Sequence, residues 1–173
     1  RPSIETLLHA FLPAKHIDHV HADSICALTN HPKGKLAVRE ALGDGFAYVD
    51  WFRPGFNLSK IVGTLKDHDG VVLAHHGLVV WDEDSDKCLS KTHLAVDQAE
   101  KYLNSLTKRP ESKFAHQDIP EKELTELLLK LRGTLKKKQI LRVDARLTEV
   151  ASRSDLPKVI AAGVSSADHM MRI

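Results

Sequence analysis

Hydrophobic positions along the first hundred residues follow two periods, one typical of helices and one typical of strands. Helical spacing predicts helices over residues 3–13, 22–29, 36–42, 57–66 and 82–106. Short apolar or alternating runs, bounded by glycine and proline, predict strands over residues 17–21, 46–51, 71–74 and 78–81. Because strands alternate with helices, the sequence predicts a layered α/β domain rather than a helical bundle or a β-sandwich.

The second part of the chain has a different pattern. Residues 107–120 are polar and contain proline, which predicts a linker. The pattern then predicts an amphipathic helix over 120–135, a strand over 140–143 and short helices over 147–153 and 156–162. We therefore divide the chain into a core, residues 1–106, and a helical or α/β extension, residues 107–173, that packs on the same domain or leads to another.

The composition disfavours several classes of protein. Of the 173 residues, 42% are hydrophobic and 28% are charged, as in ordinary globular domains. No apolar run approaches the ~18 residues of a membrane span, and a net charge of +2 is too small to predict nucleic-acid binding. Cys26 and Cys88 form neither a disulfide framework nor a CxxC motif, so we expect a cytoplasmic location. The chain starts at Arg1 without a methionine, and we expect a piece of a longer protein.

Histidines are numerous, eleven in all, and two of them form the clearest chemical pattern. His19 and His21 flank Val20 in a predicted strand, so alternation places both imidazoles on one face while Val20 points into the core. Glu5 lies on the predicted helix that leads to this strand. Imidazoles together with a carboxylate are a common ligand set for zinc or a similar divalent ion. The ordinary alternatives are exposed strand histidines and a glutamate favoured by the first turn of a helix.

A third histidine follows the apolar run at residues 71–74, where His75 and His76 are both candidates. Neighbouring residues of a strand point to opposite faces, so only one of the two can share a site with the first pair. The other is then expected in the core or behind the ligands.

Four separated motifs resemble one known family. They are Ser3-x-Glu5-x-x-x-His9, His19-x-His21, Arg53-Pro54-Gly55 and His76-Gly77-Leu78. In this order they resemble the class II aldolase/adducin family over residues 1–106, and the match selects His76 rather than His75. Two later motifs, Leu131-Arg132-Gly133 and Ser166-Ala167-Asp168-His169, resemble a narrower group, the bifunctional rhamnulose-1-phosphate aldolase/short-chain dehydrogenase (lactaldehyde dehydrogenase) proteins.

The resemblance implies a fold and a site. The fold is a three-layer α/β/α sandwich around a mixed central sheet, in a homo-oligomer, usually a tetramer, with active sites at subunit interfaces. His19, His21 and His76 would hold Zn2+ or another divalent metal. Glu5 would be the catalytic acid and base. Ser3 would contact the substrate phosphate, or serve only as a helix N-cap.

The activity implied is that of a metal-dependent lyase. It would cleave a small phosphorylated sugar, a ketose 1-phosphate such as rhamnulose 1-phosphate, to dihydroxyacetone phosphate and an aldehyde. The alternatives are a sugar-phosphate epimerase or decarboxylase of the same family, or a non-catalytic adducin-like interaction domain. Adducins lack the full ligand set that this chain retains. Three features of such enzymes are not found in this sequence. The family's phosphate-binding loops precede the Glu5 motif and are absent, and the catalytic tyrosine of the fuculose-phosphate enzyme has no match. No glycine-rich dinucleotide-binding motif indicates a dehydrogenase.

Residues around the ligands are predicted as well. A metal-bound imidazole needs a hydrogen-bond partner on its other nitrogen, and we expect Asp18 or Asp23 to serve. His9 and His93 are expected to pack near the site. Asp168 and His169, far along the chain, are further candidates to reach it.

Overall fold

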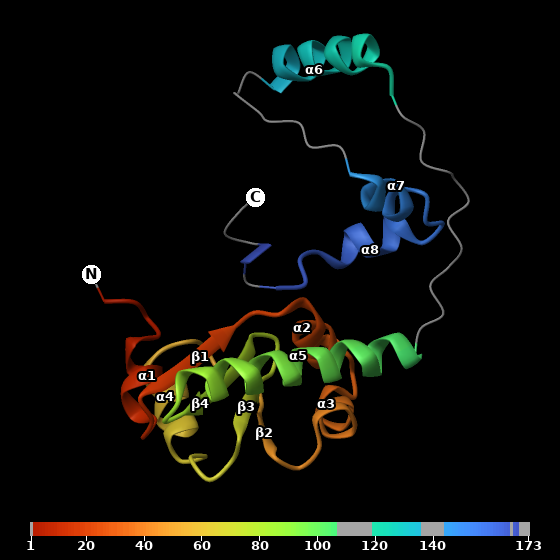
Figure 1. Ribbon diagram of the computed structural model, residues 1–173. Helices are drawn as coiled ribbons and strands as arrows, with labels where there is room; N and C mark the ends of the chain where they lie inside the picture. The colour runs from red at the N-terminus through yellow and green to blue at the C-terminus, as the bar shows by residue number, and fades with distance from the viewer. Residues whose placement is uncertain (1, 107–118, 136–143, 167, 170–173) are drawn as a thin grey trace. The chain divides into compact units, whose positions relative to one another are not determined.

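The structure, a computed structural model, describes residues 2–106, 119–135, 144–166 and 168–169 of the chain. The chain divides into two compact units, residues 1–108 with 164–173, and residues 109–163. The predicted functional division into residues 1–106 and 107–173 stays a prediction. Along residues 2–106 the elements (Figure 1) are α1 (Thr6–Phe11), β1 (His16–Val20), α2 (Asp23–Asn30), α3 (Gly34–Leu42), β2 (Phe46–Val49), α4 (Phe56–Gly63), β3 (Gly70–Leu73), β4 (Gly77–Asp82) and α5 (Ser85–Leu106).

The four strands form one mixed sheet in the order β1-β4-β3-β2. β4 pairs antiparallel with both β1 and β3, and β2 pairs parallel with β3. The register aligns Val20 of β1 with Leu78 of β4, so the end of β1 lies beside the start of β4. This pairing brings residues near 20 and residues near 77 together, although more than fifty positions separate them in the sequence.

Helices cover both faces of the sheet, which explains why β3 and β4 are apolar at nearly every position. Alternate residues of β4 point to opposite faces. Leu78 and Val80 pack with α2, α3 and α5, whereas Val79 and Trp81 pack with α1 and α4. A strand buried on both faces reads as a continuous hydrophobic run rather than as an alternation. The predicted three-layer α/β/α sandwich around a mixed sheet is confirmed.

Two predicted boundaries near the acidic run at residues 82–86 are wrong. Asp82 ends β4, where it pairs with His16, and does not begin the helix. Its Oδ1 accepts the N–H of Asp84 at 3.1 Å, which turns the chain out of the strand. Asp84 Oδ1 then accepts the N–H of Lys87 at 3.0 Å and caps α5, which begins at Ser85. The acidic residues therefore end a strand and cap a helix.

The unit formed by residues 109–163 contains three described helices, α6 (Glu121–Leu135), α7 (Ala145–Ala151) and α8 (Leu156–Ala162). They confirm the helices predicted over 120–135, 147–153 and 156–162. No side chain of α6 is buried. The predicted strand at 140–143 and most of the predicted linker lie outside the described residues. Among the helices that the structure describes, none combines the length and hydrophobicity needed to cross a membrane.

Candidate metal centre

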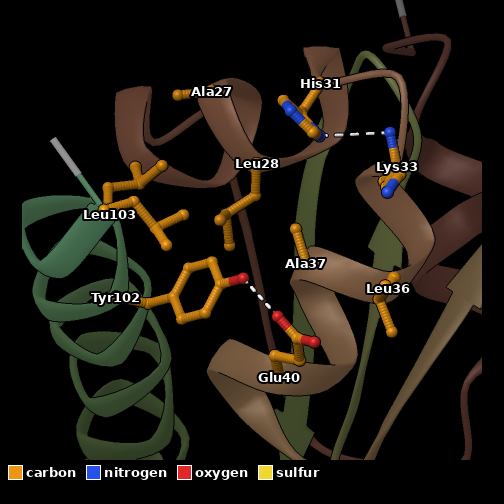
Figure 2. Close-up of a pocket in the computed structure, with 10 residues that line it drawn as sticks. Ala27, Leu28, His31, Lys33, Leu36, Ala37, Glu40, Tyr102 and Leu103 are labelled. Carbon is orange, nitrogen blue, oxygen red and sulfur yellow. Dashed lines mark hydrogen bonds between the residues drawn. The ribbon is translucent and has the colours of Figure 1, made fainter.

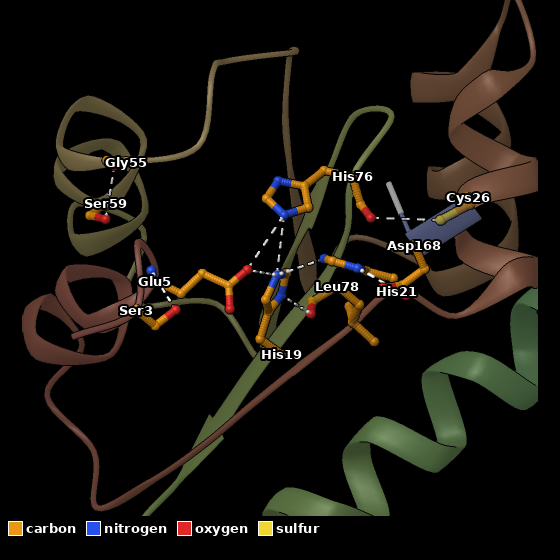
Figure 3. Close-up of polar contacts among 10 residues, drawn as sticks. All are labelled: Ser3, Glu5, His19, His21, Cys26, Gly55, Ser59, His76, Leu78 and Asp168. Atoms are coloured by element: carbon orange, nitrogen blue, oxygen red, sulfur yellow. Dashed lines mark hydrogen bonds and ion pairs between the residues drawn. The ribbon is translucent and has the colours of Figure 1, made fainter. Parts of the chain in front are cut away.

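His19 and His21 lie at the end of β1 (Figure 3), with their ring centroids 4.9 Å apart and their ring planes nearly perpendicular. β1 ends at Val20, one residue earlier than predicted, but the extended chain continues far enough to keep the alternation. The Nε2 atoms of His19 and His21 are 3.2 Å apart. Val20, between them, packs into the core under α2, α3 and α5. The predicted pairing of the two imidazoles on one face is present in the structure.

His76 reaches the same point from the turn between β3 and β4. Its Nε2 lies 3.2 Å from that of His19. The argument from strand alternation that separated His75 from His76 is wrong, because residues 74–76 form a tight turn. His75 occupies its left-handed position with φ of 57°, and its side chain is exposed, not in the core. The exposed ring bonds through Nδ1 to Oδ1 of Asn30 at 2.8 Å.

Glu5 completes the cluster from the residue that immediately precedes α1. Its Oε1 lies 3.3 Å from Nε2 of His19 and 4.0 Å from Nε2 of His76. The ligand atoms of Glu5 and the three histidines all lie within 4.8 Å of one another. Ser3 is not the N-cap of α1, a position that Glu5 occupies; its hydroxyl instead accepts the Glu5 N–H at 3.2 Å. Ser3 therefore orients the backbone that carries the carboxylate.

Hydrogen bonds on the far side of the rings determine which nitrogen is free. His19 donates Nδ1–H to the carbonyl of Leu78 at 2.9 Å, and His21 donates Nδ1–H to Oδ2 of Asp168 at 3.3 Å. Each bond leaves a lone pair on Nε2, the atom that faces the cluster. The expected partners Asp18 and Asp23 do not serve, and Asp18 instead accepts the hydroxyl of Thr92 at 3.0 Å.

Burial favours the neutral form of His19 and of His76. Burial lowers the pKa of His19, against the opposing effects of the Leu78 hydrogen bond and the Glu5 charge. Burial, followed by repulsion from the other two imidazoles, lowers the pKa of His76 to about 4. Within the described part of the chain, Nδ1 of His76 is a buried nitrogen with no hydrogen-bond partner. Neutral rings are the form that binds metal.

The spacing of the cluster fits a divalent ion. Two nitrogens bound tetrahedrally to zinc at ~2.0–2.1 Å lie about 3.3 Å apart. The two Nε2 separations that involve His19 are both 3.2 Å. The Nδ1 protons of His19 and His21 point away from the cluster. The Nε2 lone pairs of these two rings and an oxygen of the Glu5 carboxylate therefore converge, and a cation stabilises such an arrangement. The four side chains could therefore hold a metal.

The remaining candidate residues take other places. His9 and His93 line an open hollow of ≈ 450 Å³, together with Glu5 and His19. His169 does not reach the cluster; it is exposed, and its Nδ1 contacts the hydroxyl of Ser165 at 3.3 Å. Sequence reasoning missed the hydrogen bond from His19 to the Leu78 carbonyl. This bond depends on the register between β1 and β4, which the sequence of one strand alone does not reveal.

A second hollow of ≈ 490 Å³ lies between α2, α3 and the end of α5 (Figure 2). Leucine and alanine side chains form much of its lining. Tyr102 donates its hydroxyl to the carboxylate of Glu40 across it. None of the four cluster residues lines this hollow, so the hollow is not part of the histidine cluster.

Comparison with known proteins identifies the family. Residues 1–103 match the Class II Aldolase and Adducin N-terminal domain. The chain belongs to the class II aldolase and adducin family. Three of the four motifs that carried the resemblance supply the side chains that converge in the structure, namely Glu5, His19 with His21, and His76.

Relatives of this class II aldolase-family chain include the uncharacterized oxidoreductase YuxG of Bacillus subtilis (strain 168), 36% identical over 185 aligned residues. The alignment covers 99% of this chain but only 27% of that protein. The N-terminal class II aldolase domain of a conserved protein from Thermoplasma acidophilum is similar in structure, with a TM-score of 0.56 and 35% identity over 60% of this chain and 49% of that chain.

YgbL from Escherichia coli, named a "putative aldolase/epimerase/decarboxylase", shares the fold with a TM-score of 0.52. It is 22% identical, and the match covers 73% of this chain and 66% of that chain. At this identity the likeness concerns the fold alone.

Proposed function

We propose that this chain is the metal-dependent lyase part of a larger protein, and that it cleaves a ketose 1-phosphate of the rhamnulose-1-phosphate type to dihydroxyacetone phosphate and an aldehyde. The observation that carries the proposal is the convergence of the Glu5 carboxylate and three Nε2 atoms on one point. The family assignment supports aldolase chemistry. The name of YuxG and the 27% coverage of it support a fusion with an oxidoreductase.

His19, His21 and His76 are the proposed ligands, and zinc is the proposed ion, because uncharged imidazoles with one carboxylate suit it. A divalent ion held there would polarise the ketose oxygens and stabilise the negative charge that develops as the C3–C4 bond breaks. The imidazoles would contribute by holding fixed orientations, His19 through Leu78 and His21 through Asp168. Burial, which lowers the pKa of His19 and His76, keeps those two rings in the form that binds a metal.

Glu5 is the proposed acid and base. Its carboxylate lies against the imidazoles, yet its side chain keeps 33% exposure and borders the hollow with His9 and His93. It can therefore meet a substrate from the solvent side. We propose that Glu5 accepts the proton of the C4 hydroxyl as the bond breaks, and that it returns a proton to C3 to complete the dihydroxyacetone phosphate.

The proposal has one close competitor, an epimerase or decarboxylase with the same ligand set. The printed name of YgbL includes all three reactions. The products separate them, since only the aldolase releases dihydroxyacetone phosphate, only an epimerase returns an isomeric sugar phosphate and only a decarboxylase releases carbon dioxide. A tetramer and a cytoplasmic location stay predictions of the sequence.

The first test is metal content by elemental mass spectrometry. We expect about one zinc per chain in the wild type and loss of it in the double variant His19→Ala/His21→Ala. The control is His16→Ala, which removes an exposed imidazole from the same strand and should keep the metal. Release of dihydroxyacetone phosphate from rhamnulose 1-phosphate would then establish the reaction. A wild type that takes up no zinc, manganese or cobalt at neutral pH would refute the proposal.

A further inference from the structure

Residues shortly after position 163 lie beside the proposed metal centre. Asn30, the last residue of α2, donates its side-chain N–H to the carbonyl of Ser165 at 2.8 Å. Ser166 is buried, with 8% of its surface exposed. Asp168 then lies against His21, 147 positions earlier in the sequence (Figure 3). Residues 164–166 and 168–169, here called the C-terminal segment, therefore belong to the unit that carries the cluster.

The contact with His21 has a definite chemical consequence. Asp168 Oδ2 lies 3.3 Å from Nδ1 of His21, on the side of the ring away from the other imidazoles. A carboxylate in this place accepts Nδ1–H, keeps the proton off Nε2 and fixes the ring plane. It also makes the imidazole a stronger donor toward a cation.

The three imidazoles are held in different ways. His19 is fixed by the carbonyl of Leu78, which belongs to the neighbouring strand and needs no further residue. The buried Nδ1 of His76 has no partner among the residues that the structure describes. Only His21, of the three, is oriented by a side chain from a distant part of the chain. Its orientation therefore depends on the C-terminal segment.

One amide connects that segment to the turn that supplies His76. Asn30 bonds through its side-chain oxygen to Nδ1 of His75 at 2.8 Å, while its side-chain nitrogen bonds to Ser165. In addition, Thr29 accepts the backbone N–H of His75 at 3.2 Å. The end of α2 thus contacts both the C-terminal segment and the turn at residues 74–76.

We propose that Asp168 is a positioning residue of the metal centre, and that the C-terminal segment, anchored through Asn30, aligns His21 for metal binding. This inference rests on the proposed metal centre. It makes Asp168 part of a site whose proposed ligands all come from the first 76 residues. The segment acts through His21 and needs no contact with substrate.

The test measures zinc affinity by competition with a chromophoric chelator, on the full 173-residue chain. Loss of an outer partner of a metal-bound imidazole typically weakens binding by about 10–100-fold, and we expect this for Asp168→Ala. Asp168→Asn keeps an oxygen acceptor at the same place and should recover much of the affinity. Asn30→Ala should weaken binding in the same direction. The matched control is Asp44→Ala, which removes an exposed carboxylate paired with Arg39 and should leave the affinity unchanged.

A second readout needs no metal. Long-range 15N NMR of the zinc-free chain, with the His21 signals assigned from His21→Gln, should show the Nδ1–H tautomer in the wild type and in Asp168→Asn. Asp168→Ala should lose this preference. A merely structural role for Asp168 would not change the tautomer of one ring.

The outcomes are distinguishable. If the wild type and Asp168→Ala bind zinc equally, or if His21 carries its proton on Nε2 in the zinc-free wild type, the positioning role is refuted and the metal centre stands. If the wild type binds no zinc, the metal centre fails, and the inference fails with it.

Discussion

Gly77 gives the most direct test of how the sheet positions the ligands. A Cβ at this position would lie 2.4 Å from the carbonyl oxygen of Val20 and 3.0 Å from Cδ2 of His21. The neighbours are the Val20 backbone and the His21 ring, which is held by its contact with Asp168, so neither can rotate away. To reach an ordinary van der Waals separation, β1 and β4 must move apart by about 1 Å. The glycine after His76 is therefore required by the close approach of two strands.

The change Gly77→Ala should weaken both the fold and the site. Overpacking of this kind costs about 1–3 kcal/mol of unfolding free energy. A displacement of about 1 Å also exceeds the ~0.5 Å within which a binding site must be held, so we expect zinc affinity to fall on the order of tenfold. Stability is measured by urea denaturation of the zinc-free protein. Tryptophan fluorescence is the signal, because Trp51 and Trp81 both belong to the unit that contains the sheet.

Two other glycines serve as controls for Gly77→Ala. Gly70 pairs with Val80, at the other end of β3 from the turn that supplies His76. A Cβ there would lie 2.8 Å from the carbonyl oxygen of Val79, so Gly70→Ala should destabilise the sheet without changing zinc affinity. At Gly133, on exposed α6, a Cβ would meet nothing within 4 Å, and Gly133→Ala should change neither. If Gly77→Ala lowers stability as Gly70→Ala does but binds zinc within twofold of the wild type, the close approach does not position His21.

Further predictions concern the proton carrier, the buried imidazole and the thiols. Glu5→Gln should keep its zinc, because three imidazoles remain, but lose about 10²–10⁴-fold in cleavage rate, and comparable rates would exclude Glu5 as the acid and base. In the zinc-free protein the pKa of His76 is about 4 in the folded state, against 6.5 in the unfolded state. As the pH drops below 6.5, the unfolded state therefore takes up a proton that the folded state does not, and the free energy of unfolding falls. The loss should reach about 2 kcal/mol by pH 5 in urea denaturation and be absent in His76→Gln. Burial, with nearby carboxylates, raises the pKa of Cys26 and Cys88, so neither thiol should react with Ellman's reagent until the chain is denatured.

The fold was predictable where the signal is local. β3 and β4 are short apolar runs bounded by glycine, and they fall where the pattern placed them within one or two residues. The pairing of His19 with His21 follows from the two-residue period of an extended chain and does not depend on where the strand formally ends. The acidic run misled the prediction, because a carboxylate suits the end of a strand and the cap of a helix equally well. Only the pairing of Asp82 with His16 decides between them.

The site was predictable in its members but not in its geometry. Resemblance selected His76, which the structure brings into the cluster, whereas strand alternation left His75 and His76 both open. Alternation does not apply at this point, since the chain reverses at residues 74–76 and His75 adopts a positive φ there. A turn of this kind sends adjacent side chains in directions that no period describes. The hydrogen bonds that orient the His19 and His21 rings are even harder to predict from the sequence than the turn. One depends on the register of β4, and the other joins His21 to Asp168 across 147 positions. Contacts of this range leave no periodic pattern. The sequence could therefore name Asp168 as a candidate to reach the site, but only the structure shows that its carboxylate meets Nδ1 of His21.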